Sequence, residues 1–156
     1  MKIRKAEQRI LDALQKEGRI SNVNLARKLK ISESPCLRKT RALEESGVIT
    51  DYRAIVDPKK VGYGISAYVL VNLDQRSETD TTAFFDSVQD EPRIVECVAI
   101  TGTSDLVLKV VARDIEDLGR LTMEGILRHP SVKDIASSVV IKEIKPFAGL
   151  PVNQEY

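Results

Sequence analysis

Apolar residues in the first fifty positions recur every three or four residues, which is the spacing of an amphipathic helix. One such run ends at Gly18, and a second and third follow Ser21 and Ser32, residue types that cap helix N termini. Gly47 ends the third run. The sequence therefore predicts three helices, with inward positions Ile3, Ala6, Ile10, Leu11 and Leu14, then Leu25, Ala26 and Leu29, then Cys36, Leu37, Thr40 and Leu43.

Two short apolar segments follow the third helix. Residues 48–50 and 52–56 are rich in Val, Ile and Tyr, a composition typical of strands. Their position directly after a helical module predicts a small two-stranded wing.

From residue 65 the pattern changes to that of a mixed fold. Strand patterns cover residues 65–73, 94–100, 106–112 and 135–144, and helical patterns cover 80–89 and 114–129. The order β-α-β-β-α-β predicts an α+β, ferredoxin-like domain. We therefore divide the chain into a winged helix-turn-helix domain at 1–50, a wing strand and linker at 51–64, and the ferredoxin-like domain at 65–156.

A ferredoxin-like sheet carries both helices on one face and leaves the other face bare. The alternation in residues 65–73 makes that bare face partly apolar. We therefore expect it to pack against a second copy, giving a two-fold homodimer. The segment Phe147–Pro151 is expected to be a docking tail, whose apolar residues could also cover the sheet.

Charge separates the two halves of the chain. Residues 1–64 carry 15 Lys and Arg against 8 Asp and Glu, a net charge of +7, whereas residues 65–156 carry a net charge of −6. Basic modules bind phosphate backbones through counterion release, so the first half is the part expected to contact double-stranded DNA. The alternative is that two small domains differ in charge by chance.

The exposed face of the third helix provides the chemistry for such a contact. Ser34, Arg38, Arg41 and Ala42 lie opposite the inward arc. Two short helices with cations on the second form the helix-turn-helix pattern, whose recognition helix enters the major groove. Guanidinium groups can contact phosphates or guanine edges. The plainer alternative is a solvated charged helix face.

Other chemistry has little support in this sequence. Cys36 and Cys97 lack metal-ligand spacing, which favours reduced thiols and a cytoplasmic location. The single histidine, His129, precedes Pro130 at a helix end, and Ser137 and Ser138 have no adjacent base. No run of about 18 apolar residues is present, so no membrane span is predicted. We predict a protein that is not an enzyme, with no metal and no cofactor.

The segment Thr101–Asp105 separates two predicted strands and has the composition of a turn. Asp105 could bind the ammonium of a free amino acid by a charge-assisted hydrogen bond. Backbone amides around Gly102 could bind its carboxylate, because glycine allows close approach. The alternative is an ordinary turn in which glycine and aspartate serve only backbone geometry.

Several segments together resemble the Lrp/AsnC family of transcription regulators. They include Gly18–Asn22 before Leu25-Ala26, Ile31–Leu37 before Leu43-Glu44, Thr101-Gly102-x-x-Asp105, and Ser137–Glu143. The resemblance covers nearly the whole chain in order. It implies a winged helix-turn-helix joined to an amino-acid-sensing domain, homodimers that assemble into octamers or other higher oligomers, and a small amino acid as effector.

The resemblance also assigns residues to the two sites. Its recognition-helix positions fall on Ser32, Ser34, Pro35, Arg38, Lys39 and Arg41, and its effector loop on Thr101, Gly102, Thr103, Ser104 and Asp105. Thr103 replaces an acidic residue of many members, and Leu106 replaces an aromatic one, so these positions bear on which amino acid is bound.

Three functions remain open at this stage. The first is a sequence-specific DNA-binding regulator that responds to a small amino acid. The second is an architectural DNA-binding protein that needs no effector, and the third is an amino-acid-binding subunit of an enzyme. The basic charge of residues 1–64 and the exposed Arg38 and Arg41 disfavour the third function. Target promoters and the direction of regulation are not encoded in these patterns.

Overall fold

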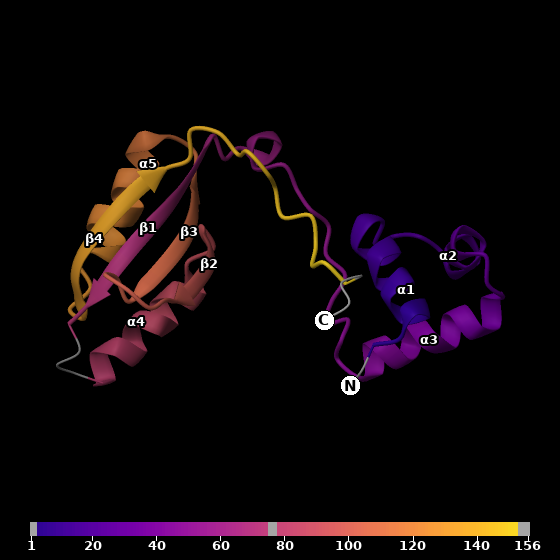
Figure 1. Ribbon diagram of the computed structural model, residues 1–156. Helices are drawn as coiled ribbons and strands as arrows, with labels where there is room; N and C mark the ends of the chain where they lie inside the picture. The colour runs from indigo at the N-terminus through magenta and orange to yellow at the C-terminus, as the bar shows by residue number, and fades with distance from the viewer. Residues whose placement is uncertain (1–2, 75–77, 153–156) are drawn as a thin grey trace. The chain divides into compact units, whose positions relative to one another are not determined.

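The computed structural model describes residues 3–74 and 78–152, which fall into two compact units (Figure 1). The C-terminal unit spans Val56–Glu143, and the N-terminal unit combines the residues up to Ile55 with the segment from Ile144 onward. The structure thus groups the end of the chain with the N-terminal unit, whereas the sequence-based division placed it in the domain at 65–156.

Three helices form the N-terminal unit, as the periodicity predicted. They are α1 (Lys5–Lys16), α2 (Asn22–Leu29) and α3 (Glu33–Glu45). The Ser21 hydroxyl accepts a hydrogen bond from the Asn24 amide at 3.2 Å, which confirms Ser21 as the N-cap of α2. The buried core consists of Ile10, Leu11, Ala13, Leu25, Ala26, Leu29, Cys36 and Leu43, with Ile31 packed against it.

The turn between α2 and α3 is tight. Lys30 takes a left-handed conformation with φ 55°, which ends α2 within one residue. Ile31 then packs into the core, and the Asn22 side-chain amide donates to the Glu33 carbonyl at 3.1 Å. These contacts fix the start of α3 relative to α2, which is the arrangement of a helix-turn-helix.

The two expected wing strands at residues 48–50 and 52–56 are not formed. The amides of Val48 and Ile49 both donate to the Leu43 carbonyl at 3.0 Å, so they close the end of α3 and do not pair with a strand. Asp51 binds the amide of Tyr52 and the guanidinium of Arg53, each at 2.7 Å. These local hydrogen bonds replace the ladder that the pattern predicted.

The C-terminal unit has the predicted β-α-β-β-α-β order. Its elements are a short 3₁₀ helix η1 (Pro58–Val61), β1 (Ile65–Leu73), α4 (Glu78–Asp90), β2 (Ile94–Ala99), β3 (Leu106–Ala112), α5 (Ile115–Gly119), the π-helical continuation η2 (Arg120–Ile126) and β4 (Val132–Val139). The strands pair antiparallel in the order β2-β3-β1-β4. This topology confirms the ferredoxin-like fold.

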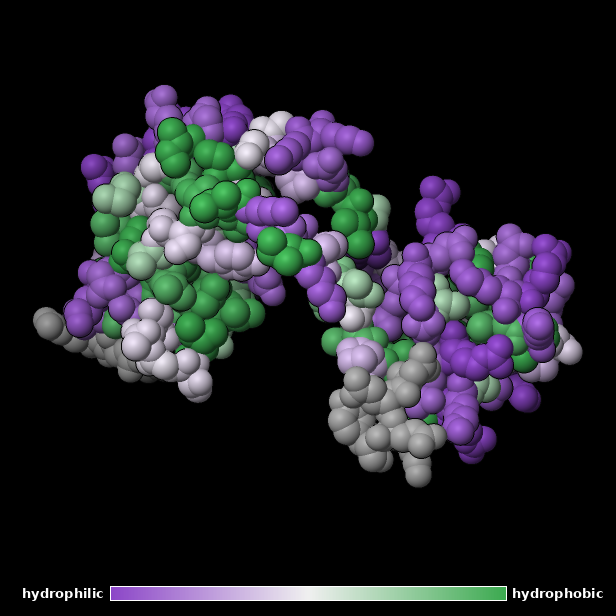
Figure 2. Space-filling view, turned by 45° about the horizontal axis from the view of Figure 1, so that its top comes forward, coloured by the Kyte–Doolittle hydropathy of each residue, from purple (hydrophilic) through white to green (hydrophobic). Residues whose placement is uncertain are grey.

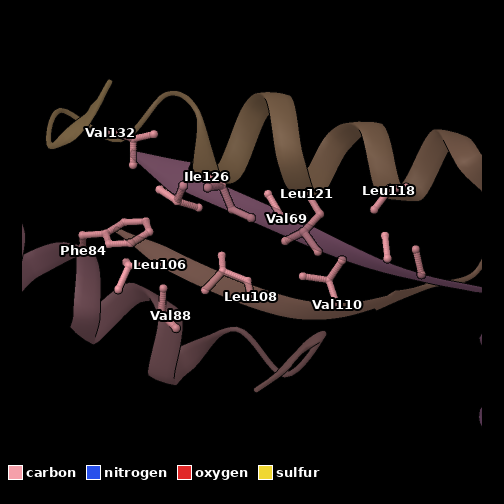
Figure 3. Packing of buried hydrophobic residues seen from close by; sticks show 13 residues of the cluster. Val69, Phe84, Val88, Leu106, Leu108, Val110, Leu118, Leu121, Ile126 and Val132 are labelled. Atoms are coloured by element: carbon pink, nitrogen blue, oxygen red, sulfur yellow. The ribbon is translucent and has the colours of Figure 1, made fainter. Parts of the chain in front are cut away.

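The core of this unit lies between the helices and one face of the sheet (Figure 3). Alternate residues of β1, including Val69, are fully buried, as are Leu108 and Val110 of β3. Phe84 of α4 is 1% exposed and Leu118 of α5 is 4% exposed, so both helices place a side chain in this core. Each such side chain contributes roughly 1.5–3 kcal/mol through burial. Among the described residues, no helix of this unit packs on the opposite face of the sheet (Figure 1).

Two strand boundaries and two inward residues differ from the sequence prediction. β4 covers Val132–Val139, whereas the apolar run predicted a strand over residues 135–144. The strand ends close to the start of its partner β1: Val139 pairs with Ala67, and the Val140 amide donates to the Ser66 carbonyl. Leu37 of α3 and Ile115 of α5 occupy inward positions of the helical patterns, but they are 38% and 65% exposed.

A buried carboxylate joins three parts of this unit. Asp117 is 2% exposed and accepts hydrogen bonds from the Arg113 amide at 3.0 Å and the Arg93 guanidinium at 3.0 Å. The pKa of Asp117 is lowered to about 2, chiefly by the Arg113 amide and then by the neighbouring guanidinium groups. The carboxylate thereby ties the start of β2 and the end of β3 to α5.

This ion-pair cluster predicts an acid-dependent loss of stability. The folded-state pKa of Asp117 lies below its unfolded value of about 3.9, so its contribution is complete above that value and is lost as pH falls toward 2. We expect Asp117→Asn to lower the melting temperature at pH 7 by more than about 5 °C. Between pH 4 and 2 the stability of the variant should fall less steeply than that of the wild type. Parallel slopes in melts followed by circular dichroism would contradict this assignment.

Candidate functional site

The exposed face of α3 presents the predicted cations to solvent. Ser34, Arg38 and Arg41 are exposed, while Cys36 and Leu43 on the opposite face are buried. Within residues 3–74 and 78–152, no carboxylate pairs with Arg38 or Arg41. Their guanidinium groups are therefore available to an anionic partner, and the buried face holds the helix on its own core.

The remaining predicted residues of α3 have different surroundings. Ser32 is the N-cap of α3 but its hydroxyl makes no capping hydrogen bond, and Pro35 lies exposed in the first turn. Lys39 is half-buried, with its Nζ 3.9 Å from Oε1 of Glu7 on α1. Lys39 thus links α3 to α1, in contrast to Arg38 and Arg41.

The loop at residues 100–105 joins β2 to β3 and is anchored on β1. The Asp105 amide donates to the Val71 carbonyl at 3.1 Å, and its carboxylate Oδ2 accepts from the Leu73 amide at 2.8 Å. The Ile100 amide closes the loop on the Asp105 carbonyl at 2.9 Å. Asp105 therefore holds the loop against the end of β1 with one carboxylate oxygen, and this second role was not predicted from the sequence.

The tip of the loop is open to solvent. Thr101, Gly102 and Thr103 are exposed, and Ser104 is half-buried. Gly102 has a φ of 130°, a conformation that favours glycine, and no atom lies within 4 Å of the position that a Cβ would take. The structure thus brings all five predicted effector residues into one short loop with free space around the glycine.

The two cysteines and the histidine fit structural roles. Burial raises the pKa of the Cys36 and Cys97 thiols, which favours the protonated form of both at neutral pH. The His129 Nδ1 lies 3.0 Å from the Ser131 hydroxyl, and the ring packs edge-on against Phe84. Among the described residues no cluster of potential metal ligands occurs, and none of their helices is long and apolar enough to span a membrane.

Comparison with known protein families finds a matching family model for each half of the chain. A winged helix-turn-helix DNA-binding model matches residues 3–50, and a model of the Lrp/AsnC ligand binding domain matches residues 66–150. This chain belongs to the Lrp/AsnC family. It is accordingly a DNA-binding transcription regulator with an amino-acid-binding domain.

Individual Lrp/AsnC proteins match over almost their full length. The chain is 32% identical to the transcriptional regulator AzlB of Bacillus subtilis over 93% of this chain and 92% of that protein. It is 34% identical to the leucine-responsive regulatory protein of Escherichia coli, over 89% of this chain and 85% of that protein. These relatives are transcription regulators, in agreement with the expectation of a non-enzymatic protein.

A solved Lrp/AsnC structure agrees with the fold in detail. A transcriptional regulator from Neisseria meningitidis, solved as a complex with L-methionine, superposes with a TM-score of 0.93 at 34% identity, covering 97% of this chain and 98% of that one. An AsnC-family regulator from Agrobacterium tumefaciens gives a TM-score of 0.88 at 28% identity, with 96% and 97% covered.

Proposed function

We propose that this regulator binds specific DNA sites through α3 and that a small amino acid bound at the loop 101–105 changes that binding. Within the described residues, the guanidinium groups of Arg38 and Arg41 are exposed and pair with no carboxylate, and the buried face of α3 fixes the helix that carries them. This observation carries the proposal. Ser32, Ser34 and Pro35 lie at the N-terminal end of the same helix, where they support contacts to the DNA backbone. Lys39 supports the interface through its contact with Glu7.

The effector loop has groups complementary to both ends of a free amino acid. Oδ2 of Asp105 is engaged by the Leu73 amide, which leaves Oδ1 for an ammonium group. The hydroxyls of Thr101, Thr103 and Ser104 and the backbone at Gly102 belong to the same short loop as this carboxylate. The L-methionine complex of the similar Neisseria protein supports a small amino acid as the ligand class.

One chain leaves the tip of this loop exposed, whereas small-molecule sites enclose most of their ligand. A second copy is the simplest source of the missing enclosure, and the bare sheet face supports self-association. That face presents Tyr68 and Leu70 of β1, Val98 of β2 and Val107 of β3. Figure 2 shows apolar side chains gathered at the surface of this unit. We infer a homodimer, with higher oligomers built from it.

The self-association of the full chain can be tested at the sheet face. We expect a dimer or larger assembly at 10 μM, and we expect Leu70→Asp to shift it to monomer, because a buried unpaired carboxylate is costly. Ile115→Asp is the matched control, since Ile115 is 65% exposed on a helix of the same unit. Sedimentation velocity gives the masses. A wild-type monomer at this concentration would contradict the inference.

A screen of the twenty common L-amino acids tests the effector role most broadly. An amino acid that binds only the folded state stabilises it by about 2.7 kcal/mol at a concentration of 100 Kd, which raises the melting temperature measurably. We expect one or a few amino acids to do so. An unchanged melting temperature with each of the twenty at 10 mM would refute an amino acid effector. In a separate DNA titration, equal affinity for all DNA sequences would favour the architectural function.

A further inference from the structure

The segment after β4, residues 140–152, is called the strap here. Its first residues make little packing contact after the chain leaves the sheet. At the start of the strap, the Val140 amide donates to the Ser66 carbonyl of β1 at 2.8 Å. Ile141, Ile144 and Phe147 are then 99%, 82% and 79% exposed. Over this stretch the strap forms no helix or strand, so its path is not fixed by the C-terminal unit.

The far end of the strap is fixed on α1 of the N-terminal unit (Figure 1). The Gln15 side-chain amide donates to the Leu150 carbonyl at 3.1 Å, and the Leu150 amide donates to Gln15 Oε1 at 2.6 Å. Two residues on, Val152 packs against the core of that unit. A single glutamine thus holds both backbone groups of Leu150, as a neighbouring strand would.

Gly149 is what allows this close approach. It has a φ of 95°, and a Cβ at this position would lie 2.6 Å from Gln15 Oε1 and 2.9 Å from Gln15 Cδ. A larger residue would therefore be strained in its backbone and would also push the glutamine away. The fit of Gly149 and Gln15 indicates a specific docking contact.

Helix α1, on which the strap docks, also contacts α3. Ile10 and Leu11 of α1 share one core with Cys36 and Leu43 of α3, and Glu7 of α1 lies 3.9 Å from Lys39 of α3. The chain from β4 to Leu150 therefore joins the effector-binding unit to α1 by a route separate from the linker at residues 51–64.

We propose that the docked strap is a coupling element through which DNA binding at α3 and the state of the β4 end of the sheet influence each other. Any ligand that favours one arrangement of α1 then changes strap docking, and coupling of this kind acts equally in both directions. The inference extends the proposed regulatory function, but its test needs DNA alone and no effector.

Hydrogen exchange measured by mass spectrometry on the full chain tests the coupling, with random-sequence duplex DNA at low salt as the probe. In Gly149→Ala and Gln15→Ala we expect peptides covering 146–152 to exchange about tenfold faster, because the Leu150 amide loses its acceptor. Gln8→Ala on the same helix is the matched control. In the wild type and in Gln8→Ala, DNA should slow exchange both in the strap and at the end of β4.

The two docking variants should bind the DNA more weakly than the wild type, by the factor by which DNA slows exchange in the wild-type strap, and they should lose the effect of DNA on β4. Wild-type exchange at 146–152 in both variants would show that the strap does not dock through Gln15 and Gly149. Persistence of the DNA effect on β4 in both variants, or its absence in the wild type, would refute the coupling. A chain that responds to no amino acid would refute the proposed effector role and leave these measurements unaffected.

Discussion

Asp105→Asn should weaken binding of the amino acid effector by about a hundredfold, or about 2.7 kcal/mol. Asparagine keeps an oxygen that can accept from the Leu73 amide, so the loop stays on β1 while the negative charge that attracts the ammonium is lost. The melting temperature without ligand should therefore stay near that of the wild type. Isothermal calorimetry with the strongest amino acid from the thermal screen measures the affinity.

Two further variants separate charge from loop geometry. Asp105→Ala removes the Leu73 contact as well, so we expect it to lose stability in addition to ligand affinity. Asp134→Asn is the matched control, because Asp134 lies on β4, outside the loop, and its carboxylate accepts from the Asn72 side chain at 2.8 Å. If Asp105→Asn bound the amino acid as the wild type does, the carboxylate would serve only to hold the turn.

The double variant Arg38→Ala/Arg41→Ala should lose at least a hundredfold in affinity for its DNA site while keeping its fold and assembly. Both side chains are exposed and unpaired within the described residues, so their removal leaves no buried group unsatisfied. An arginine that contacts a guanine edge should cost about 1–3 kcal/mol and relax specificity at that base, whereas one on phosphate should reduce the salt slope by about 1. Anisotropy titrations over a salt series distinguish these roles.

Arg128→Ala is the control for that experiment, since Arg128 is exposed on the acidic C-terminal unit. Lys39→Ala gives a further comparison: because Lys39 contacts Glu7, we expect it to lower affinity with little change in the salt slope. Wild-type affinity in the double variant would mean that a different surface contacts DNA.

Local patterns predicted the elements whose contacts are local. The three N-terminal helices and the Ser21 cap followed from periodicity and capping chemistry, and the alternation in β1 gave the inward set that includes Val69. The two predicted wing strands are not formed, because the amides of Val48 and Ile49 donate to a carbonyl of α3. The predicted end of β4 was also wrong. The strand ends where its pairing with β1 ends, and the apolar pattern does not show which residues have a pairing partner.

In the two candidate sites, too, local features could be predicted from the sequence, whereas contacts between distant residues could not. Exposure of Arg38 and Arg41 could be deduced from one helical wheel, whereas the pairing of Lys39 with Glu7 depends on how α1 and α3 pack. Asp105 was found as a candidate from its loop, but its bond to Leu73 spans 32 residues of sequence. The docking of Leu150 on Gln15 spans 135 residues, so the sequence could predict a docking tail at Phe147–Pro151 but not that it docks on α1.

The most direct test of the central claim is a DNA titration with and without the amino acid identified by the screen, starting with L-methionine. The duplex is one selected by the protein from a random-sequence pool. We expect saturating amino acid to change DNA affinity by at least about fivefold, and DNA to change the affinity for the amino acid by the same factor. An amino acid that binds at the loop and leaves both DNA affinity and assembly unchanged would contradict the account.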